Sequence, residues 1–252
     1  PIGDHAHSPV KGLVHRYRDR VLLKVHSACV VYCRFCFRRE MVGPGGDNMS
    51  ETELKDAFSY IAGNENIWEV ILTGGDPLAL NVGRLNQIFD ALEAIDHVSV
   101  VRLHTRVPVA APGRITQDLI DVLSCRRKTV YVAVHTNHAL ELTAEAGEAC
   151  QHLAEAGIPL LGQTVLLKGV NDDVATLDSL FRKMVTFRIT PYYLHHPDLA
   201  PGTGHFRVSL RDGQKLMKAL RGLLSGIALP NYMLDIPGGF GKVPAEDNYI
   251  TC

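Results

Sequence analysis

Residues 21–26 read Val-Leu-Leu-Lys-Val-His, and residues 29–36, which follow almost at once, read Cys-Val-Val-Tyr-Cys-Arg-Phe-Cys. The first stretch is short, rich in branched apolar residues and bounded by polar ones, which is typical of a buried strand. Five further stretches of this kind follow along the chain, at residues 69–72, 98–103, 129–135, 159–167 and 189–195. The sequence therefore predicts six strands, the first of which leads into a loop with three cysteines.

Amphipathic stretches lie between these strands. Residues 50–53, Ser-Glu-Thr-Glu, form a capping box, and apolar residues then recur at 54, 57, 58 and 61 with the spacing of one helix face. The spacing recurs at 85, 88, 89 and 92, and the remaining helices are expected at 118–123, 144–156, 175–185 and 210–224.

Six β-then-α units in a row indicate an α/β fold with a parallel sheet covered by helices. Six units are too few to close an eight-fold barrel, so we expect a partial (β/α)6 TIM-type barrel, with a flat doubly wound sheet as the alternative. We expect one domain over residues 1–252, made of a lead-in (1–19), the barrel (20–225) and a C-terminal segment (226–252).

The bulk properties exclude some classes of partner. The net charge of −1 implies no overall attraction to nucleic acid or to a membrane surface. No apolar run approaches the roughly 18 residues of a membrane span, and no signal peptide is visible. The chain begins at Pro1, so we expect a processed or partial version of a longer product. Three of its six cysteines lie within eight residues, which favours metal binding in the cytoplasm over a disulfide framework.

Polar residues gather where the predicted strands end. They are Ser27, residues 73–76, His104, His135, Gln163 and residues 195–196. In barrels the carboxyl ends of the strands build the active site, so this rim is the expected site.

The three cysteines follow the pattern C-x3-C-x2-C. Three thiolates, from Cys29, Cys33 and Cys36, can hold three irons of a 4Fe–4S cube, whereas a closed electron-transfer cluster uses four. The fourth iron is then open to a ligand such as S-adenosylmethionine, whose reductive cleavage yields a radical that abstracts hydrogen. The alternative is structural zinc, which needs four ligands.

Residues 73–77, Thr-Gly-Gly-Asp-Pro, follow the second predicted strand. Gly74 and Gly75 let the backbone approach a ligand closely. With Asp76, we expect them to hold the amino group of S-adenosylmethionine.

With these residues in hand, the chain resembles the lysine 2,3-aminomutase family of radical S-adenosylmethionine, pyridoxal-phosphate enzymes. The resemblance covers essentially the whole chain. It includes the segments at residues 15–20, 29–39, 73–77, 135–138, 163–167, 169–172, 191–193, 204–207 and 235–242.

The resemblance implies a role for each of several residues. Lys242, in Gly-Gly-Phe-Gly-Lys, looks like the lysine that forms a Schiff base with pyridoxal phosphate. Arg38 matches the position that binds the substrate carboxylate, which suits a guanidinium fork. Asp198 and Asp235 match the aspartates that receive the distant ammonium of lysine.

The resemblance also extends to cofactor contacts. His135 and Gln163 look like members of the S-adenosylmethionine site, and Arg16 and Tyr17 like contacts to pyridoxal phosphate. The cysteines that bind a structural zinc in some members have no counterparts here, and Asp173 stands in one such place.

The implied activity is that of an isomerase that moves the amino group of L-lysine from C2 to C3 and gives L-β-lysine. The alternatives are the related enzyme that makes β-lysine for elongation factor P, and a mutase for glutamate or arginine. A non-enzymatic iron–sulfur or zinc module is a third class. The implied partners are an electron donor such as flavodoxin or ferredoxin and, in a homo-oligomer, further copies of the chain.

Overall fold

The structure, a computed structural model, describes residues 4–43, 45–236 and 241–246. One sheet of nine strands runs through it, and the order in the sheet follows the order in the chain. The strands are β1 (Leu13–Tyr17), β2 (Arg20–His26), β3 (Glu69–Gly74), β4 (Val100–Thr105), β5 (Thr129–His135), β6 (Leu160–Val165), β7 (Ile189–His195), β8 (Asn231–Ile236) and β9 (Gly241–Pro244). Strands β2 to β8 are parallel, whereas β1 and β9 are antiparallel to their neighbours at the two edges.

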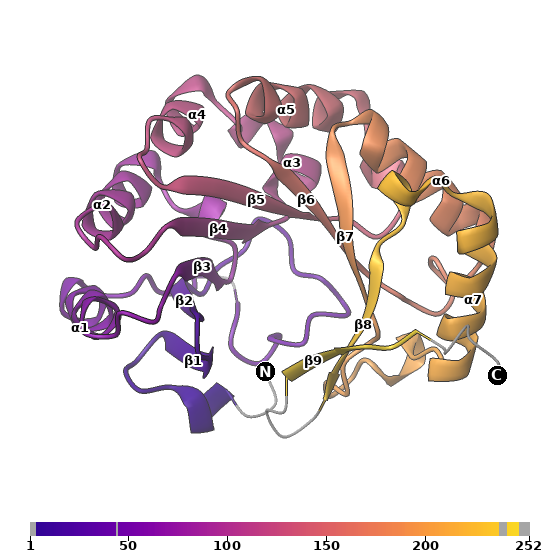
Figure 1. Cartoon of the computed structure of the whole chain (residues 1–252), viewed down its shortest axis with the longest axis horizontal. Coiled ribbons are helices and arrows are strands. Elements are labelled where there is room, and N and C mark those ends of the chain that lie inside the picture. Colours follow the sequence, from indigo (N-terminus) through magenta and orange to yellow (C-terminus); the bar gives the residue numbers. More distant parts are fainter. Residues whose placement is uncertain (1–3, 44, 237–240, 247–252) are drawn as a thin grey trace.

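Helices cover the convex outer face of this curved sheet (Figure 1). They are α1 (Glu51–Ala62), α2 (Val82–Glu93), α3 (Val107–Ala110), α4 (Gln117–Ser124), α5 (Ala144–Glu155), α6 (Val174–Thr186) and α7 (Leu210–Leu223). Short 3-10 turns lie at Asp4–His7, Pro77–Ala79, Pro112–Arg114, Ala139–Glu141, Gly204–Phe206 and Gly226–Ala228. Each of β2 to β7 is thus followed by a helix. The partial (β/α)6 barrel is confirmed, and the flat doubly wound alternative is wrong.

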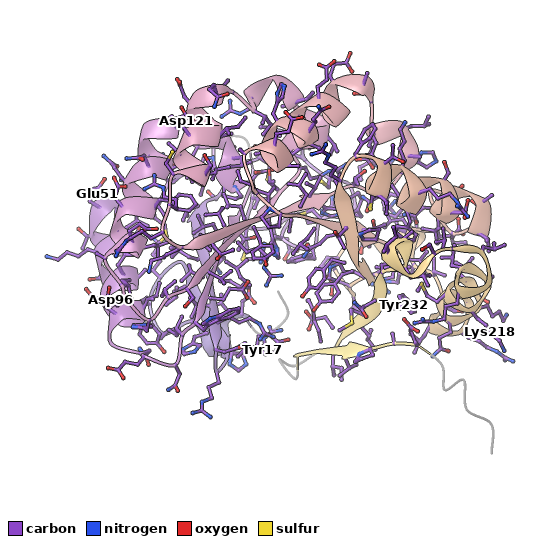
Figure 2. The ribbon with its side chains drawn as sticks, turned by 45° about the horizontal axis from the view of Figure 1, so that its top comes forward. Tyr17, Glu51, Asp96, Asp121, Lys218 and Tyr232 are labelled. Atoms are coloured by element: carbon purple, nitrogen blue, oxygen red, sulfur yellow. The ribbon has the colours of Figure 1, made fainter. Side chains whose placement is uncertain are left out.

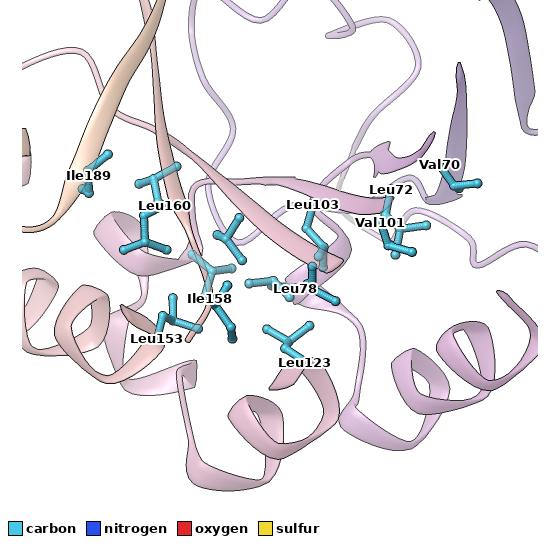
Figure 3. Packing of buried hydrophobic residues seen from close by; sticks show 14 of the residues in the cluster. Val70, Leu72, Leu78, Val101, Leu103, Leu123, Leu153, Ile158, Leu160 and Ile189 are labelled. Atoms are coloured by element: carbon cyan, nitrogen blue, oxygen red, sulfur yellow. The ribbon is translucent and has the colours of Figure 1, made fainter. Parts of the chain in front are cut away.

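Residues alternate between the two faces of each strand, which separates the core from the interior of the barrel. In β3, Val70 and Leu72 belong to the hydrophobic core, whereas Ile71 lines the interior cavity. In β4, Val101 and Leu103 repeat this pattern. Figure 3 shows Leu103 above Leu123 of α4, and Ile158 beside Leu153 of α5. The core therefore lies between sheet and helices, and the inner face is left for polar groups.

The sequence did not predict β1, β8 or β9. Strand β8 pairs in parallel with β7, so the barrel has one more parallel strand than expected. Both edge strands are short, and β9 has four residues and ends in a proline. Only Leu13 and Val14 of β1 are buried, so its sequence lacks the apolar run by which the other strands were recognised.

The two edge strands meet through side chains on the open side of the barrel. Nη1 of Arg16, on β1, lies 3.4 Å from Oδ1 of Asp235 on β8. The backbone N–H of Lys242, on β9, donates to the hydroxyl of Tyr17 at 2.8 Å, and Tyr17 lies beside the open edge in Figure 2. We call this junction of β1 with β8 and β9 the seam. Within the described residues, no helix is long and apolar enough to span a bilayer.

Candidate active site

A cavity of about 530 Å³ lies inside the barrel, where the carboxyl ends of the strands meet the loop between β2 and α1. The loop crosses the concave side of the sheet (Figure 1). Each residue to which the sequence analysis gave a catalytic or binding role lines this cavity: Arg16, Tyr17, Cys29, Cys33, Cys36, Arg38, Gly74, Gly75, Asp76, His135, Gln163, Asp198, Asp235 and Lys242. Of the polar residues expected at the rim, Ser27 does not line it. The structure thus gathers residues from both ends of the chain, and their individual roles stay predictions.

The cysteine loop presents three free, half-buried thiols. A turn brings the last two together, because the backbone N–H of Cys36 donates to the carbonyl of Cys33 at 3.0 Å. Burial raises the pKa of Cys29 to about 12, so a metal must displace the proton of this thiol when it binds. In the described residues, no three His, Cys, Asp or Glu side chains converge on a point for one ion. A cube whose three irons each take one thiolate does not need such a point.

Gly74 and Gly75 hold the cysteine loop against the end of β3. Gly74 has φ +118°, and a Cβ there would lie 2.3 Å from the carbonyl oxygen of His26. A Cβ on Gly75 would lie 2.0 Å from the carbonyl oxygen of Ala28. The two glycines therefore allow the loop to approach the chain's own backbone at the residues that lead into the cysteines. Their approach to S-adenosylmethionine stays a prediction.

The Asp76 carboxylate is buried and fully engaged. Oδ1 accepts from the hydroxyl of Thr105 at 2.6 Å and from the N–H of Leu78 at 3.0 Å, and Oδ2 accepts from the N–H of Arg106 at 2.8 Å. Burial raises the pKa of Asp76, and these hydrogen bonds oppose the shift. Its side chain joins the ends of β3 and β4 and so fixes the loop next to the glycines.

Histidines at the rim are neutral. Burial lowers the pKa of His135 to about 3, and the nearby Arg106 adds to the effect. The His135 ring lies 5.6 Å from that of Phe35 in the cysteine loop, measured between centroids. Burial also places the pKa values of His104 and His195 well below the usual value. Neutral imidazoles can accept or donate a hydrogen bond inside the cavity without adding charge. Gln163, on β6, is buried beside them.

Lys242 and Asp235 form an ion pair at the seam. Nζ of Lys242 lies 2.7 Å from Oδ2 of Asp235, whose other oxygen faces Arg16. Gly241 has φ +90°, and a Cβ there would lie 2.9 Å from the Tyr17 hydroxyl. This glycine therefore serves both the turn into Lys242 and the approach of β9 to β1. The preceding Gly238, Gly239 and Phe240 lie outside the described residues.

Arg38 and Asp198 both line the cavity, and the charge of each acts on the pKa of the other. Nη1 of Arg38 donates to the hydroxyl of Thr73 at 2.8 Å. Burial lowers the pKa of Arg38, and the charges of Asp4, Cys36 and Asp198 oppose this shift. Burial raises the pKa of Asp198, Lys242 lowers it, and Asp235 raises it. The two predicted ammonium-binding aspartates are therefore electrostatic neighbours, as their predicted role requires.

Sequence reasoning missed several groups that line the cavity. Tyr192 and Tyr193 stack at 3.7 Å between ring centroids, and the Tyr192 hydroxyl donates to that of Tyr193 at 2.8 Å. Adjacent strand residues normally face opposite sides, but the register shifts here, since Gly162 pairs with Pro191 and Gln163 with Tyr193. Such a bulge left no signal in the sequence. Arg106 was also missed, although it follows β4 at the rim.

The residues present fit anionic ligands. Arg16, Arg38 and Arg106 each bury a guanidinium Nε–H that has no hydrogen-bond partner among the described residues. A buried donor without a partner costs about 1–3 kcal/mol, which an entering carboxylate or phosphate would remove. The volume is in the range of small-molecule sites, roughly 300–1,000 Å³. The cavity therefore suits a phosphate-bearing cofactor and amino-acid carboxylates, and its thiols suit an iron–sulfur cluster.

Comparisons with known proteins agree with this chemistry. The chain matches the Radical SAM superfamily over residues 23–180. It is 42% identical over 251 residues to L-lysine 2,3-aminomutase of Methanococcus maripaludis, a match that covers 100% of this chain and 58% of that protein. It is 39% identical over 251 residues to glutamate 2,3-aminomutase of Clostridioides difficile, covering 100% of this chain and 59% of that protein. The chain thus spans less than two thirds of the length of these curated relatives.

Solved structures confirm the fold. SuiB of Streptococcus suis bound to S-adenosylmethionine superposes with a TM-score of 0.65 at 13% identity, covering 88% of this chain and 51% of that one. At this identity the likeness concerns the partial barrel alone.

Proposed function

Because the chain belongs to the lysine 2,3-aminomutase family of the Radical SAM superfamily, we propose that it is an isomerase that converts L-lysine to L-β-lysine. One observation carries the proposal beyond the family: the three cysteines and the Lys242–Asp235 pair, which come from opposite ends of the chain, line the same cavity. An amino group can move between adjacent carbons only if hydrogen abstraction and amino-group binding occur at one place.

Each of the three cofactors has residues suited to hold it. Cys29, Cys33 and Cys36 would hold the 4Fe–4S cluster, and the segment Gly74–Asp76 with His135 and Gln163 would hold S-adenosylmethionine. Lys242 would hold pyridoxal phosphate, with Arg16 and Tyr17 beside it. When bound, the cluster and S-adenosylmethionine supply a 5′-deoxyadenosyl radical, and pyridoxal phosphate supplies a conjugated ring that spreads an unpaired electron.

The protein's own side chains would bind and orient the substrate. The guanidinium of Arg38 presents parallel N–H donors that fit the α-carboxylate, and its buried Nε–H has no acceptor among the described residues. Asp198 and Asp235 give the far end of the cavity a negative charge that matches the side-chain ammonium of lysine. Nζ of Lys242 lies 2.7 Å from Oδ2 of Asp235, so Asp235 already pairs with an alkylammonium group in this structure.

The same charges separate the candidate substrates. Asp198 and Asp235 would repel the side-chain carboxylate of glutamate, which disfavours the glutamate reaction despite the 39% identity to that mutase. The side chain of arginine is also positive, so charge does not separate it from lysine, and its greater length is the difference that the cavity would have to detect. The alternative is the related enzyme that makes β-lysine for attachment to elongation factor P, which uses the same chemistry.

The reaction requires partners that the chain does not supply. One electron must reach the cluster from a donor such as a flavodoxin or ferredoxin, and a reduced cytoplasm would keep the cluster intact. Association with further copies of the chain is compatible with the proposal, and size-exclusion chromatography of the reconstituted protein would measure it.

The decisive experiment is an anaerobic assay of the reconstituted chain. The chain is supplied with S-adenosylmethionine, pyridoxal phosphate and a strong reductant, and L-lysine, L-glutamate and L-arginine are tested in parallel reactions. The protein is then removed by size exclusion, and the β-amino acid products are separated by chromatography. We expect β-lysine alone. Turnover of glutamate but not lysine would overturn the substrate assignment.

Two variants separate the parts of the proposal. Cys33→Ala should lose iron and abolish cleavage of S-adenosylmethionine, and retained cleavage would refute the cluster assignment. Lys242→Ala should keep iron and the cluster absorption but lose the visible band that pyridoxal phosphate gives when attached to a lysine. A band retained in this variant would place the cofactor on another residue.

A further inference from the structure

Arg106 lies against the cysteine loop although no motif marked it. It follows the last residue of β4, and its Nη1 donates to Sγ of Cys33 at 2.9 Å. Its Nη2 pairs with Oε2 of Glu141, and its side chain is 17% exposed. Among the hydrogen bonds of the described residues, this is the one from an arginine side chain to a cysteine sulfur. The guanidinium therefore bridges a predicted cluster ligand and a carboxylate.

Contacts that do not involve Cys33 hold this arginine in place. Its backbone N–H donates to Oδ2 of Asp76 at 2.8 Å, and its guanidinium lies 5.7 Å from the centre of the Phe35 ring. Glu141 is itself fixed, since its Oε1 accepts from the N–H groups of Asn137 at 2.8 Å and His138 at 3.1 Å. The position of the guanidinium is thus set by β4, by the loop after β5 and by the segment before α5.

A fixed cation at a cluster ligand has a defined electrostatic effect. When a 4Fe–4S cluster gains one electron, negative charge increases on its sulfur ligands. A charge-assisted hydrogen bond to such a ligand becomes stronger in the reduced state than in the oxidised one. Hydrogen bonds and net charge around the sulfurs are among the factors that set the reduction potential of a cluster.

We propose that Arg106 is a positioning residue for electron transfer: its hydrogen bond to Cys33 raises the reduction potential of the cluster. The proposal rests on the proposed function, because it requires the cluster. One electron passes from the external donor to the cluster, no covalent bond changes, and Arg106 keeps its proton. The residue would make reduction of the cluster accessible to a physiological donor rather than take part in the rearrangement.

The test compares arginine variants in the reconstituted full chain. Arg106→Gln removes the charge but keeps a donor of similar reach, and Arg106→Lys keeps the charge but loses the fork. Arg126→Gln is the matched control, because Arg126 is similarly buried and pairs with Asp90 between α2 and the end of α4, away from the cysteines. Iron content reports whether each variant holds its cluster, and a redox titration followed by electron paramagnetic resonance gives the midpoint potential without substrate.

We expect Arg106→Gln to keep its iron and to shift the midpoint potential to a more negative value, Arg106→Lys to shift it less, and Arg126→Gln to leave it unchanged. Cleavage of S-adenosylmethionine by Arg106→Gln should fall more with a weak reductant than with a strong one. An unchanged or more positive potential in Arg106→Gln would overturn the proposal.

A further variant covers loss of the cluster. If Arg106→Gln loses its iron, Glu141→Gln decides, because it keeps Arg106 but removes the charge of its anchor. A more negative midpoint potential of Glu141→Gln with full iron supports the proposal, because loss of the carboxylate charge alone would make the potential more positive. An unchanged or more positive potential overturns it. A wild-type chain that binds no iron would instead refute the proposed function, so the two failures are distinguishable.

Discussion

The cavity has two walls that are built in different ways. One wall, from β2 to β4, carries the cysteine loop and the glycine loop, and backbone hydrogen bonds fix it. The N–H of Gly75 donates to the carbonyl of His26 at 2.6 Å, and that of Asp76 to Ala28 at 2.9 Å. The other wall is the seam, where Asp235 links Arg16 and Lys242 through side-chain ion pairs.

The difference matches what each wall has to do. A cluster needs thiolates at fixed positions, and backbone ladders allow little movement. A lysine that must reach a cofactor needs a side chain that can leave its partner. An ion pair that is partly exposed, as Lys242 is at 34%, holds its lysine with only modest free energy. The wall proposed to hold the cluster is therefore rigid, and the wall proposed to bind the amino group can rearrange.

The largest expected effect breaks the rigid wall. Gly75→Ala places a Cβ where the carbonyl of Ala28 lies, and backbone must shift to make room. We expect a loss of about 2–4 kcal/mol in the free energy of unfolding, together with loss of iron binding. Gly113→Ala is the control, since nothing lies within 4 Å of its Cβ position. Equal stability of the two variants in urea denaturation would contradict the argument.

The seam should respond through substrate binding rather than through stability. Asp235→Ala removes the carboxylate that faces both Lys242 and Arg16. Losing a charge-assisted hydrogen bond costs about 1.5–3 kcal/mol, so the KM for lysine should rise about tenfold or more while iron content stays constant. Steady-state kinetics under anaerobic conditions measure this. If KM is unchanged here and also in Asp198→Ala, the ammonium site lies elsewhere.

His135 sits between the two walls and gives a pH test. Its pKa is about 3 in the folded chain, below the usual 6.5, so below pH 6.5 the unfolded chain binds more protons than the folded one. Stability should therefore fall as the pH drops below 6.5, with a contribution of at most about 1.4 kcal/mol per pH unit, and stay level above it. Urea titrations between pH 5 and 8 measure the slope. His135→Gln should reduce it, and an unchanged slope would show that other groups dominate.

The smallest effect concerns the hydrogen bond from the backbone N–H of Lys242 to Tyr17 across the seam. Tyr17→Phe removes the hydroxyl that accepts from the N–H of Lys242. We expect about 1 kcal/mol less protection of that amide in hydrogen exchange, with the amides of β5 unaffected. Unchanged protection of Lys242 would mean that the seam does not depend on this bond.

The sequence was sufficient for the wall of parallel strands because its signals are local. Each of β2 to β7 has an apolar run between polar ends, and the C-x3-C-x2-C spacing lies on a single loop. The residues of the rim could be placed together because parallel strands end on one side. The family resemblance supplied the rest of the site, which includes Arg38, Asp198, Asp235 and Lys242, and the structure brings all of these to the cavity.

What the sequence did not reveal depends on contacts between distant segments. Strands β1 and β9 are short edge strands that pair with β2 and β8, and their outer edges meet through side chains of the seam. The bulge at Tyr192 arises from the register with β6, and Arg106 stands out only once Cys33 lies 2.9 Å away. None of these features has a local pattern, so only three-dimensional coordinates could show them.

The seam has one further consequence for how the cavity is filled. In the described residues no backbone pairing joins β1 to β9, so the sheet curves into an open ring whose two edges are linked by side chains. Among the contacts of the seam, the ring can widen by breaking one ion pair, Arg16–Asp235, and the hydrogen bond from Lys242 to Tyr17, while every ladder stays intact. Molecules as large as a nucleoside cofactor could then enter between the edge strands, and the contacts of the seam would form again after entry.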